Sequence, residues 1–467
     1  MTSRARRFAG LLLLALAGLV LAALLDGRGS PGDRATDATR IVTDVTNRAP
    51  AADAATRGPG GPAHGPAVVP AVVPAVVPDP ASSDPVARGA YLALAGNCAG
   101  CHTARGGRPY AGGRGIETPF GTIYASNLTP DVETGIGAWR GEAFRRALRE
   151  GRSRDGRALY PAFPYTEYTR ISDADADALF AYLRSLEPAR EPTPPHALRF
   201  PWNLPWLLEG WRLLYFRPAR FEPDPARDAS WNRGAYLVQG LGHCGACHTA
   251  RNLLGGQTGT PLGGAATPLR GWHVPSLLDD RDGGVASWTQ AETVDWLASG
   301  LNTRAIASGP MAQVVANSLQ HLVPADLDAM ANYLRALPRV ERTARAARAE
   351  LAPGTATLAL GAQRYTEHCA DCHGERGEGA PPHWPALAGN RTLTMDSPVN
   401  AISTVLHGGF PPATRANPRP YGMPPAGPVL DDTEAAALIS FLRNAWGHAA
   451  PATLAREVNA LRPIPVE

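Results

Sequence analysis

The residues of this chain that can do chemistry begin with six cysteines, all of which lie in three Cys-x-x-Cys-His units. Two thiols three residues apart, followed at once by an imidazole, are the attachment signature of c-type haem. The thiols add to the two vinyl groups of the porphyrin, and the histidine becomes an iron ligand. We therefore predict three covalently bound haems c. The predicted attachment residues and iron-binding histidines are Cys98, Cys101 and His102 in the first unit, Cys244, Cys247 and His248 in the second, and Cys369, Cys372 and His373 in the third.

Three other uses of paired cysteines explain the pattern less well. A structural zinc ion needs four ligands, and three well-separated pairs cannot all combine into such sites. Disulfides suit an oxidising compartment, but they give no reason for a histidine directly after every second cysteine. Thiol-disulfide exchange needs a thioredoxin-like strand and helix around the motif, and the sequence does not predict one.

A low-spin electron-transfer haem commonly takes methionine as its second axial ligand, which raises its potential relative to a second histidine. Met311 follows His248 by 63 residues, and Met423 follows His373 by 50 residues, each with a proline beside it. A neighbouring proline stiffens the loop that presents the sulfur to the iron. We predict Met311 and Met423 as iron ligands, whereas Met330 falls on a helical apolar stripe and is expected to pack in the core.

The elements that position these residues recur along the chain, which indicates an internal repeat. Arg-Gly-Ala-Tyr precedes the first unit at residues 88–91 and the second at 233–236, and Gly361 and Tyr365 precede the third. Between the first and second copies, tryptophan, leucine and glycine also recur at the same offsets, which predicts a helix that is closed by glycine. These residues are Trp139, Leu148 and Gly151, and Trp288, Leu297 and Gly300.

Each copy ends in an amphipathic helix, predicted over 172–186, 324–337 and 431–446, because apolar residues recur at i, i+3 and i+4. Almost no strand-like alternation intervenes. The predicted fold class is therefore all-α, with three tandem class I cytochrome c-like domains. The predicted parts are a signal peptide or anchor (1–28), a disordered linker (29–84), domain 1 (85–195), an aromatic-rich connector (196–225), domain 2 (226–345), domain 3 (353–448) and a C-terminal tail (449–467).

The amino terminus predicts export. Arg4, Arg6 and Arg7 precede an apolar run at residues 8–25, the order of a bacterial signal peptide, and the run is also barely long enough for a membrane anchor. Cleaved signal and retained anchor both stay open. The linker that follows contains Ala-Val-Val-Pro three times over 67–78, which favours an extended spacer because proline at every fourth position blocks helix and sheet. We expect the folded part on the periplasmic side of the inner membrane.

The net charge argues against one class of partner. The chain carries a formal charge of +3, and four arginines against one aspartate within residues 1–28 account for all of it. The remainder is near neutral, so no electrostatic reason exists to propose nucleic acid as a partner.

Beyond the haem motifs, several further segments carry a family resemblance: residues 119–124, 127–130, 134–137 with Trp139, 159–161, 231–237, 242–249 and 421–425. Through them the chain resembles the triheme cytochrome c subunits of bacterial membrane-bound alcohol, gluconate, sorbitol and aldehyde dehydrogenases, over about residues 84–448. The resemblance implies a subunit that takes electrons from a separate catalytic subunit, which would be a flavoprotein, a quinoprotein or a molybdenum enzyme, and delivers them to ubiquinone in the inner membrane. No dinucleotide or flavin fingerprint lies between a strand and a helix, so no substrate-oxidising site of its own is predicted.

The chain departs from the family pattern at Phe163, where relatives have methionine before proline. Phe163 follows His102 by 61 residues, and no methionine lies between Met1 and Met311. Phenylalanine cannot bind iron, so we expect the first haem to be five-coordinate, or to take an unusual ligand such as His64, His196 or water. The ring could simply pack on the haem, or the open iron could bind carbon monoxide, nitric oxide or peroxide.

Two other functions and one surface stay open at this point. A free-standing periplasmic electron shuttle would use the same haems, and a haem enzyme or ligand binder would act through an open first iron. The segment 200–216 is crowded with tryptophan, leucine, tyrosine and phenylalanine but is too short to span a bilayer. It is expected to pack between domains, with partial docking on a membrane or a partner.

Overall fold

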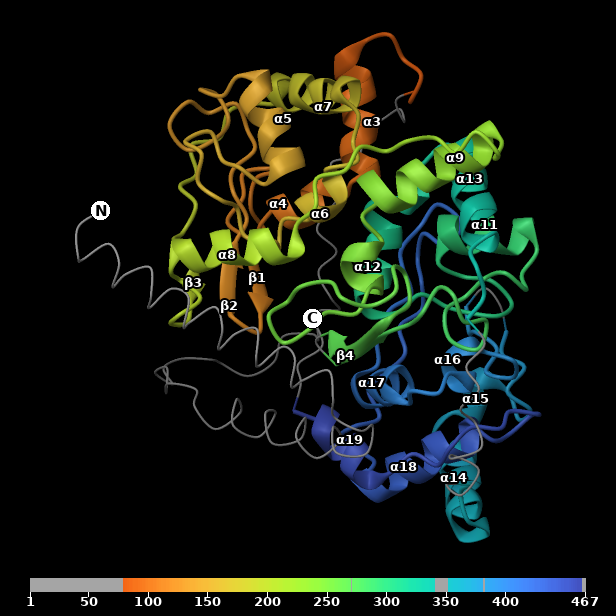
Figure 1. Cartoon of the computed structure of the whole chain (residues 1–467). Helices are drawn as coiled ribbons and strands as arrows, with labels where there is room; N and C mark the ends of the chain where they lie inside the picture. The colour runs from red at the N-terminus through yellow and green to blue at the C-terminus, as the bar shows by residue number, and fades with distance from the viewer. Residues whose placement is uncertain (1–78, 270, 341–351, 381–382, 464–467) are drawn as a thin grey trace. The chain divides into compact units, whose positions relative to one another are not determined.

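The computed structural model describes residues 79–269, 271–340, 352–380 and 383–463 (Figure 1). The predicted signal or anchor and nearly all of the predicted linker lie outside these residues. Within the described part of the chain, no helix is both long and apolar enough to cross a membrane. The chain is mostly helical, and "first", "second" and "third segment" below denote the parts that begin at helices α3, α9 and α14.

The first segment begins with a well-capped helix, since the Asp84 carboxylate accepts hydrogen bonds from the amides of Val86 and Ala87 and Pro85 occupies the first turn. Its elements are α3 (Pro85–Ala95), α4 (Cys98–His102), β1 (Gly115–Thr118), β2 (Gly121–Tyr124), α5 (Gly141–Glu150), α6 (Tyr165–Tyr168) and α7 (Asp173–Ser185). The connector that follows contributes β3 (Ala197–Leu198) and α8 (Pro205–Tyr215).

The second segment repeats this order with two additional elements, a π-helix and a 3-10 helix. Cys244 follows Gly234 by ten positions, whereas Cys98 follows Gly89 by nine. The π-helix accommodates the one extra residue. Its elements are α9 (Ala229–Tyr236), the π-helix η1 (Leu237–Leu241), α10 (Gly245–His248), β4 (Ala265–Leu269), β5 (Trp272–Val274), α11 (Gln290–Ser299), α12 (Gly309–Asn317), the 3-10 helix η2 (Leu319–His321) and α13 (Pro324–Arg335).

The third segment ends in a helix beyond its predicted boundary. Val458 and Leu461 of the last helix are buried in the core of this segment, so residues predicted as a C-terminal tail take part in the packing. The elements are α14 (Thr355–His368), α15 (Ala370–His373), α16 (Arg391–Thr394), α17 (Val399–His407), α18 (Asp432–Leu442) and α19 (Ala455–Leu461).

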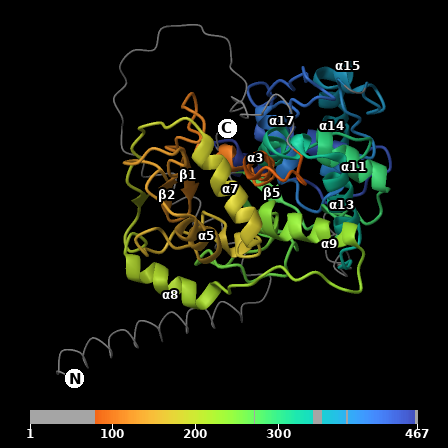
Figure 2. The same ribbon diagram turned by 90° about the horizontal axis from the view of Figure 1, so that it is seen from above.

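In each segment the opening helix crosses the closing helix: α3 on α7 and α9 on α13, as both views show (Figures 1 and 2), and α14 on α18 (Figure 1). The crossing point is a glycine in every case. A Cβ at Gly89, Gly234 or Gly361 would lie 1.9, 1.9 or 2.2 Å from a backbone carbonyl oxygen of the closing helix. The repeated glycine of the sequence is therefore required by close helix packing, because any side chain would push the two backbones apart.

The helices that were predicted to be closed by glycine end as expected, and side chains cap the starts of two closing helices. Gly151 and Gly300 end α5 and α11 with φ of 59° and 70°, and the Ser172 hydroxyl accepts from the Asp175 amide at the start of α7. Asp431 and Glu434 form a capping box at α18.

The prediction of an all-α fold is wrong in one respect, because two small sheets are present. β1 and β2 pair antiparallel, with Gly115 opposite Tyr124, and β3 of the connector adds to β2. β4 and β5 form a second antiparallel pair. These strands have five residues or fewer, so they are too short to give a period-two pattern in the sequence.

Candidate functional site

Each Cys-x-x-Cys-His unit forms a short helix just after the opening helix of its segment. The first cysteine of each unit is half-buried and the second is exposed, and all six thiols are free. In the first two units the residue before the first cysteine has a positive φ, 49° at Asn97 and 41° at His243. This left-handed residue ends the preceding helical run, so the unit begins a new helix with its own direction.

The three histidines share one hydrogen bond that fixes their tautomer. Nδ1 lies 2.7 Å from the Ser126 carbonyl oxygen in His102, 2.8 Å from that of Pro275 in His248, and 3.0 Å from that of Pro385 in His373. A carbonyl oxygen only accepts, so Nδ1 must carry the proton and Nε2 keeps its lone pair free for a metal. Such a partner also fixes the ring of an iron-binding histidine.

The electrostatics of the units favour neutral groups. Burial lowers the pKa of His102, His248 and His373, and the backbone hydrogen bond opposes this shift only in part. Burial also raises the pKa of the first thiol of each unit, to about 12 at Cys98 and Cys244 and to about 11 at Cys369. A neutral imidazole is the form that binds iron, and two free thiols beside it are the groups that add to the porphyrin vinyls. The residues therefore fit haem c.

The predicted second ligands lie in similar settings. Met311 is half-buried near the start of α12, and it packs with Cys244 against the core that the first two segments share. Met423 is held by an antiparallel bridge to Gly409, with N–O distances of 2.7 and 3.0 Å, and packs with Cys369 against the third core. Their role as iron ligands stays a prediction. Met330 is 2% exposed and belongs to the core.

Phe163 occupies the corresponding place in the first segment. It is half-buried, and its ring meets that of Tyr168 edge-on at 5.5 Å. Tyr168 in turn donates a hydrogen bond to the carbonyl of Gly96, two residues before Cys98. Of the alternative ligands, His196 uses Nδ1 to accept from the Tyr124 amide, and His64 lies outside the described residues.

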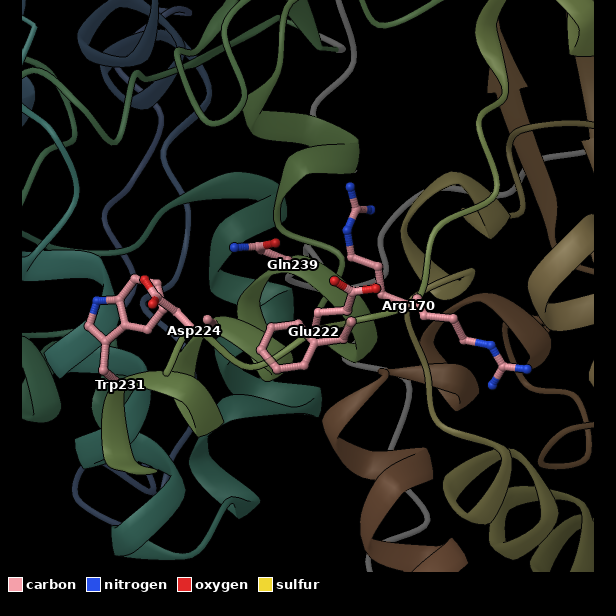
Figure 3. A pocket seen from close by; sticks show the side chains of 8 residues that line it. Arg170, Glu222, Asp224, Trp231 and Gln239 are labelled. Carbon is pink, nitrogen blue, oxygen red and sulfur yellow. The ribbon is translucent and has the colours of Figure 1, made fainter. Parts of the chain in front are cut away.

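A separate cavity of about 260 Å³ lies beside α9. Figure 3 shows Trp231 and Asp224 at one end of it and Arg170 at the other. Its lining contains no cysteine, and both arginine and carboxylate side chains take part. We therefore treat it as distinct from the haem sites.

Comparison with known proteins connects these features to a family. A family model for cytochrome c matches residues 86–187 and 358–446. The cytochrome c subunit of the quinone alcohol dehydrogenase from Gluconacetobacter polyoxogenes is 37% identical over 397 residues, which cover 82% of this chain and 85% of that subunit. The gluconate 2-dehydrogenase cytochrome c subunit from Pantoea cypripedii is 35% identical over 400 residues, 82% of this chain and 91% of that one.

This chain belongs to the cytochrome c subunits of dehydrogenases. The resemblance found in the sequence is thereby confirmed. A subunit of this family carries covalently bound haem c and transfers electrons within a dehydrogenase complex. A nicotinate dehydrogenase component from Pseudomonas putida is also similar, 42% identical over 380 residues, although this cytochrome c subunit spans only about a third (31%) of its length.

The haem-attachment residues of this cytochrome c subunit stay a prediction from the sequence, and sequence reasoning missed the partners of the three histidines. The carbonyls of Ser126, Pro275 and Pro385 lie 24, 27 and 12 residues after their histidines. Because this separation differs in every segment, no sequence pattern connects the three positions.

Phe163 generates a direct prediction. With no sulfur at this position, the reduced protein should bind carbon monoxide at about one of its haems, because an open or weakly held iron site accepts a sixth ligand. Phe163→Met should abolish carbon monoxide binding and raise the potential of that haem. The measurement is the Soret shift of the reduced protein under carbon monoxide, followed by a redox titration. Six-coordinate spectra at every haem of the unaltered protein, with no carbon monoxide shift, would contradict the prediction.

Proposed function

We propose that this chain is a triheme c-type cytochrome that relays electrons from a dehydrogenase catalytic subunit to ubiquinone, on the periplasmic side of the inner membrane. The observation that carries the proposal is the threefold repetition of one site: two thiols on a short helix, with a histidine whose Nδ1 is held by a backbone carbonyl. The six cysteines would hold the porphyrins, and His102, His248 and His373 would bind the irons. Haem bound at these residues would supply one-electron redox chemistry.

The middle segment needs its own support, because the cytochrome c family model does not match it. Its glycine crossing, its glycine-closed helix α11 and its His248–Pro275 hydrogen bond repeat those of the first segment. A diheme cytochrome c-type protein from Cereibacter sphaeroides is 37% identical over 279 residues, which cover 92% of that protein. These features support a third haem domain between the two that the family model matches.

The partner is proposed from the relatives, whose names assign them to alcohol, gluconate and fructose dehydrogenases. The catalytic subunit would be a flavoprotein, a quinoprotein or a molybdenum enzyme. A free-standing shuttle is the alternative, and the position of Phe163 favours small-ligand binding at the first haem as a second activity.

One surface supports docking to the membrane or to the partner. On α8, Leu208 and Arg212 are buried, and Trp211 donates its ring N–H to the Leu254 carbonyl at 2.9 Å. The other face of the same helix is exposed to solvent, where Trp206 is 55% exposed and Leu213 is 79% exposed. A helix that packs on one side and leaves tryptophan and leucine in water on the other is typical of an interaction surface. Figure 2 shows α8 at the margin of the first segment.

The proposed function is tested by the number of haems in the natural protein and by the subunit that purifies with it. Iron and pyridine haemochrome assays should give three haems per chain, and a haem-stained denaturing gel should show them covalently bound. The chain should purify from membranes with a dehydrogenase subunit in stoichiometric amount. Two or fewer haems in matured protein would contradict the triheme proposal, and a chain that always purifies alone and soluble would favour the shuttle.

The two tryptophans of α8 separate docking from packing. Trp206→Ser should weaken attachment to membranes or to the partner while changing the free energy of unfolding by less than about 0.5 kcal/mol, because more than half of this residue's surface is already exposed to water. Trp211→Ser, the matched control, should lower the free energy of unfolding by ~2–4 kcal/mol, since it removes a packed ring and a hydrogen bond. Membrane flotation and denaturant titration measure the two effects. Unchanged attachment of the Trp206 variant would remove α8 as a docking surface.

A further inference from the structure

Two buried tyrosines, Tyr91 and Tyr236, each form a hydrogen bond with the other of the first two segments, and they are called the exchanged pair below. Tyr91 of α3 donates its hydroxyl to Asp326 on α13, with an O–O distance of 2.6 Å. Tyr236 of α9 donates to Asp175 on α7 at 2.5 Å. The two aspartate side chains are only 6% and 3% exposed. Each opening helix thus reaches the closing helix of the other segment.

Both carboxylates are also held within their own segment. Arg88 contacts Asp175 through Nε at 2.9 Å, and Arg233 forms two hydrogen bonds of 2.8 Å with Asp326. The Arg-Gly-Ala-Tyr repeat therefore has three separate tasks. Its arginine fixes the carboxylate of the same segment, its glycine allows the helices to cross, and its tyrosine binds the neighbouring segment.

Each tyrosine hydroxyl also accepts a hydrogen bond at the same helix end. The donors are the backbone N–H of Ser172 to Tyr236, at 3.1 Å, and that of Val323 to Tyr91, at 3.3 Å. Ser172 and Val323 are the N-cap residues of α7 and α13, and the aspartates stand three residues later. In a capping box the side chain of that later residue would accept directly from the N-cap amide. Here a hydroxyl from the other segment stands between the two groups.

The third segment offers an internal comparison. At α18 the two residues of the capping box bond to each other directly: Glu434 accepts from the Asp431 amide at 3.0 Å, and Asp431 accepts from the Glu434 amide at 2.8 Å. Gln363, two residues after the crossing glycine, takes the place that Tyr91 and Tyr236 have in the other segments, and its amide bonds only within its own helix, to Glu367. The exchanged pair thus belongs to the first two segments. The contact is reciprocal, because each segment contributes one tyrosine and one aspartate, as at a two-fold symmetric interface.

The exchanged pair holds two haem-attachment units against each other. A Cβ at Gly96, two residues before Cys98, would lie 3.2 Å from the Leu241 side chain. Tyr168 donates to the Gly96 carbonyl, and its ring meets His243, the residue before Cys244, edge-on at 5.5 Å. A single layer of side chains therefore separates the two units.

A second contact between the first segment and the second haem unit involves α6. The Gln257 amide donates both to Glu167 of α6, at 2.7 Å, and to the carbonyl of Gly245, at 2.9 Å. Gly245 lies inside the second haem unit, so the Gln257 side chain links α6 of the first segment to that unit.

We infer that Tyr91 and Tyr236 are positioning residues for electron transfer between the first and second haems. They hold the two haem-attachment units at one spacing and one mutual orientation, so that haems bound there would exchange one electron without a search for a productive arrangement. The step moves one electron and neither forms nor breaks a bond. The inference rests on the proposed triheme function.

The experiment is circular dichroism in the Soret band, because two haems held close together in a fixed orientation give a split, two-signed signal. The full chain should show this couplet. Loss of the second haem in a Cys244→Ala/Cys247→Ala variant should abolish it, whereas loss of the third haem in Cys369→Ala/Cys372→Ala should leave it. Tyr91→Phe/Tyr236→Phe should lose most of the couplet at full haem content. The matched control is Tyr365→Phe on α14, whose hydroxyl bonds to the backbone of its own segment, at Gly374 and Gly377, and it should keep the couplet.

Several outcomes would overturn the inference. A full chain with three haems and no couplet, or a couplet that survives loss of the second haem, would show that these two haems are not a fixed pair. An unchanged couplet in the double tyrosine variant would remove the positioning role. If that variant matures poorly, the single change Tyr236→Phe applies the same criterion. A wild-type haem count below three contradicts the proposed function instead, so the two failures are distinguishable.

Discussion

The hydrogen bond between each haem-site histidine and a backbone carbonyl is the constraint on which the rest of the structure depends. It forces the proton onto Nδ1 and leaves Nε2 as the only nitrogen able to bind iron. The carbonyl must therefore be brought to one place relative to a short helix that carries two thiols. The opening helix, the glycine crossing and the closing helix form the frame that holds this arrangement in all three segments.

The second segment contacts both of its neighbours, which suits a relay. The exchanged tyrosines join it to the first segment. From the third segment, the Arg391 guanidinium lies 4.7 Å from the centre of the Trp288 ring, and Asn400 exchanges two hydrogen bonds with the backbone of His273. Burial lowers the pKa of Arg391 to about 10, so this contact contains a costly desolvated cation, and the tryptophan face offsets part of that cost. Electrons that pass through the second haem would have short packed routes on both sides.

The sequence predicted those features that depend on local chemistry. The haem units, the glycine-closed helices and the capped closing helices each depend on a few neighbouring residues, and Gly151 and Gly300 end their helices as predicted. The features that were missed depend on residues far apart in the chain. Asp326 lies 235 residues from Tyr91, the π-helix compensates for a single added residue, and the short strands are defined only by their partners. No local pattern specifies such pairings.

The central claim, a relay that runs through the second haem, is tested most directly by removing that haem from the complete complex. In a complex with its dehydrogenase subunit, a Cys244→Ala/Cys247→Ala variant would keep the first and third haems. On addition of the dehydrogenase's substrate, the α-band absorbance should show that only one of the two remaining haems is reduced, and reduction of added ubiquinone should be lost. Rapid reduction of both haems with ubiquinone reduction intact would contradict the account.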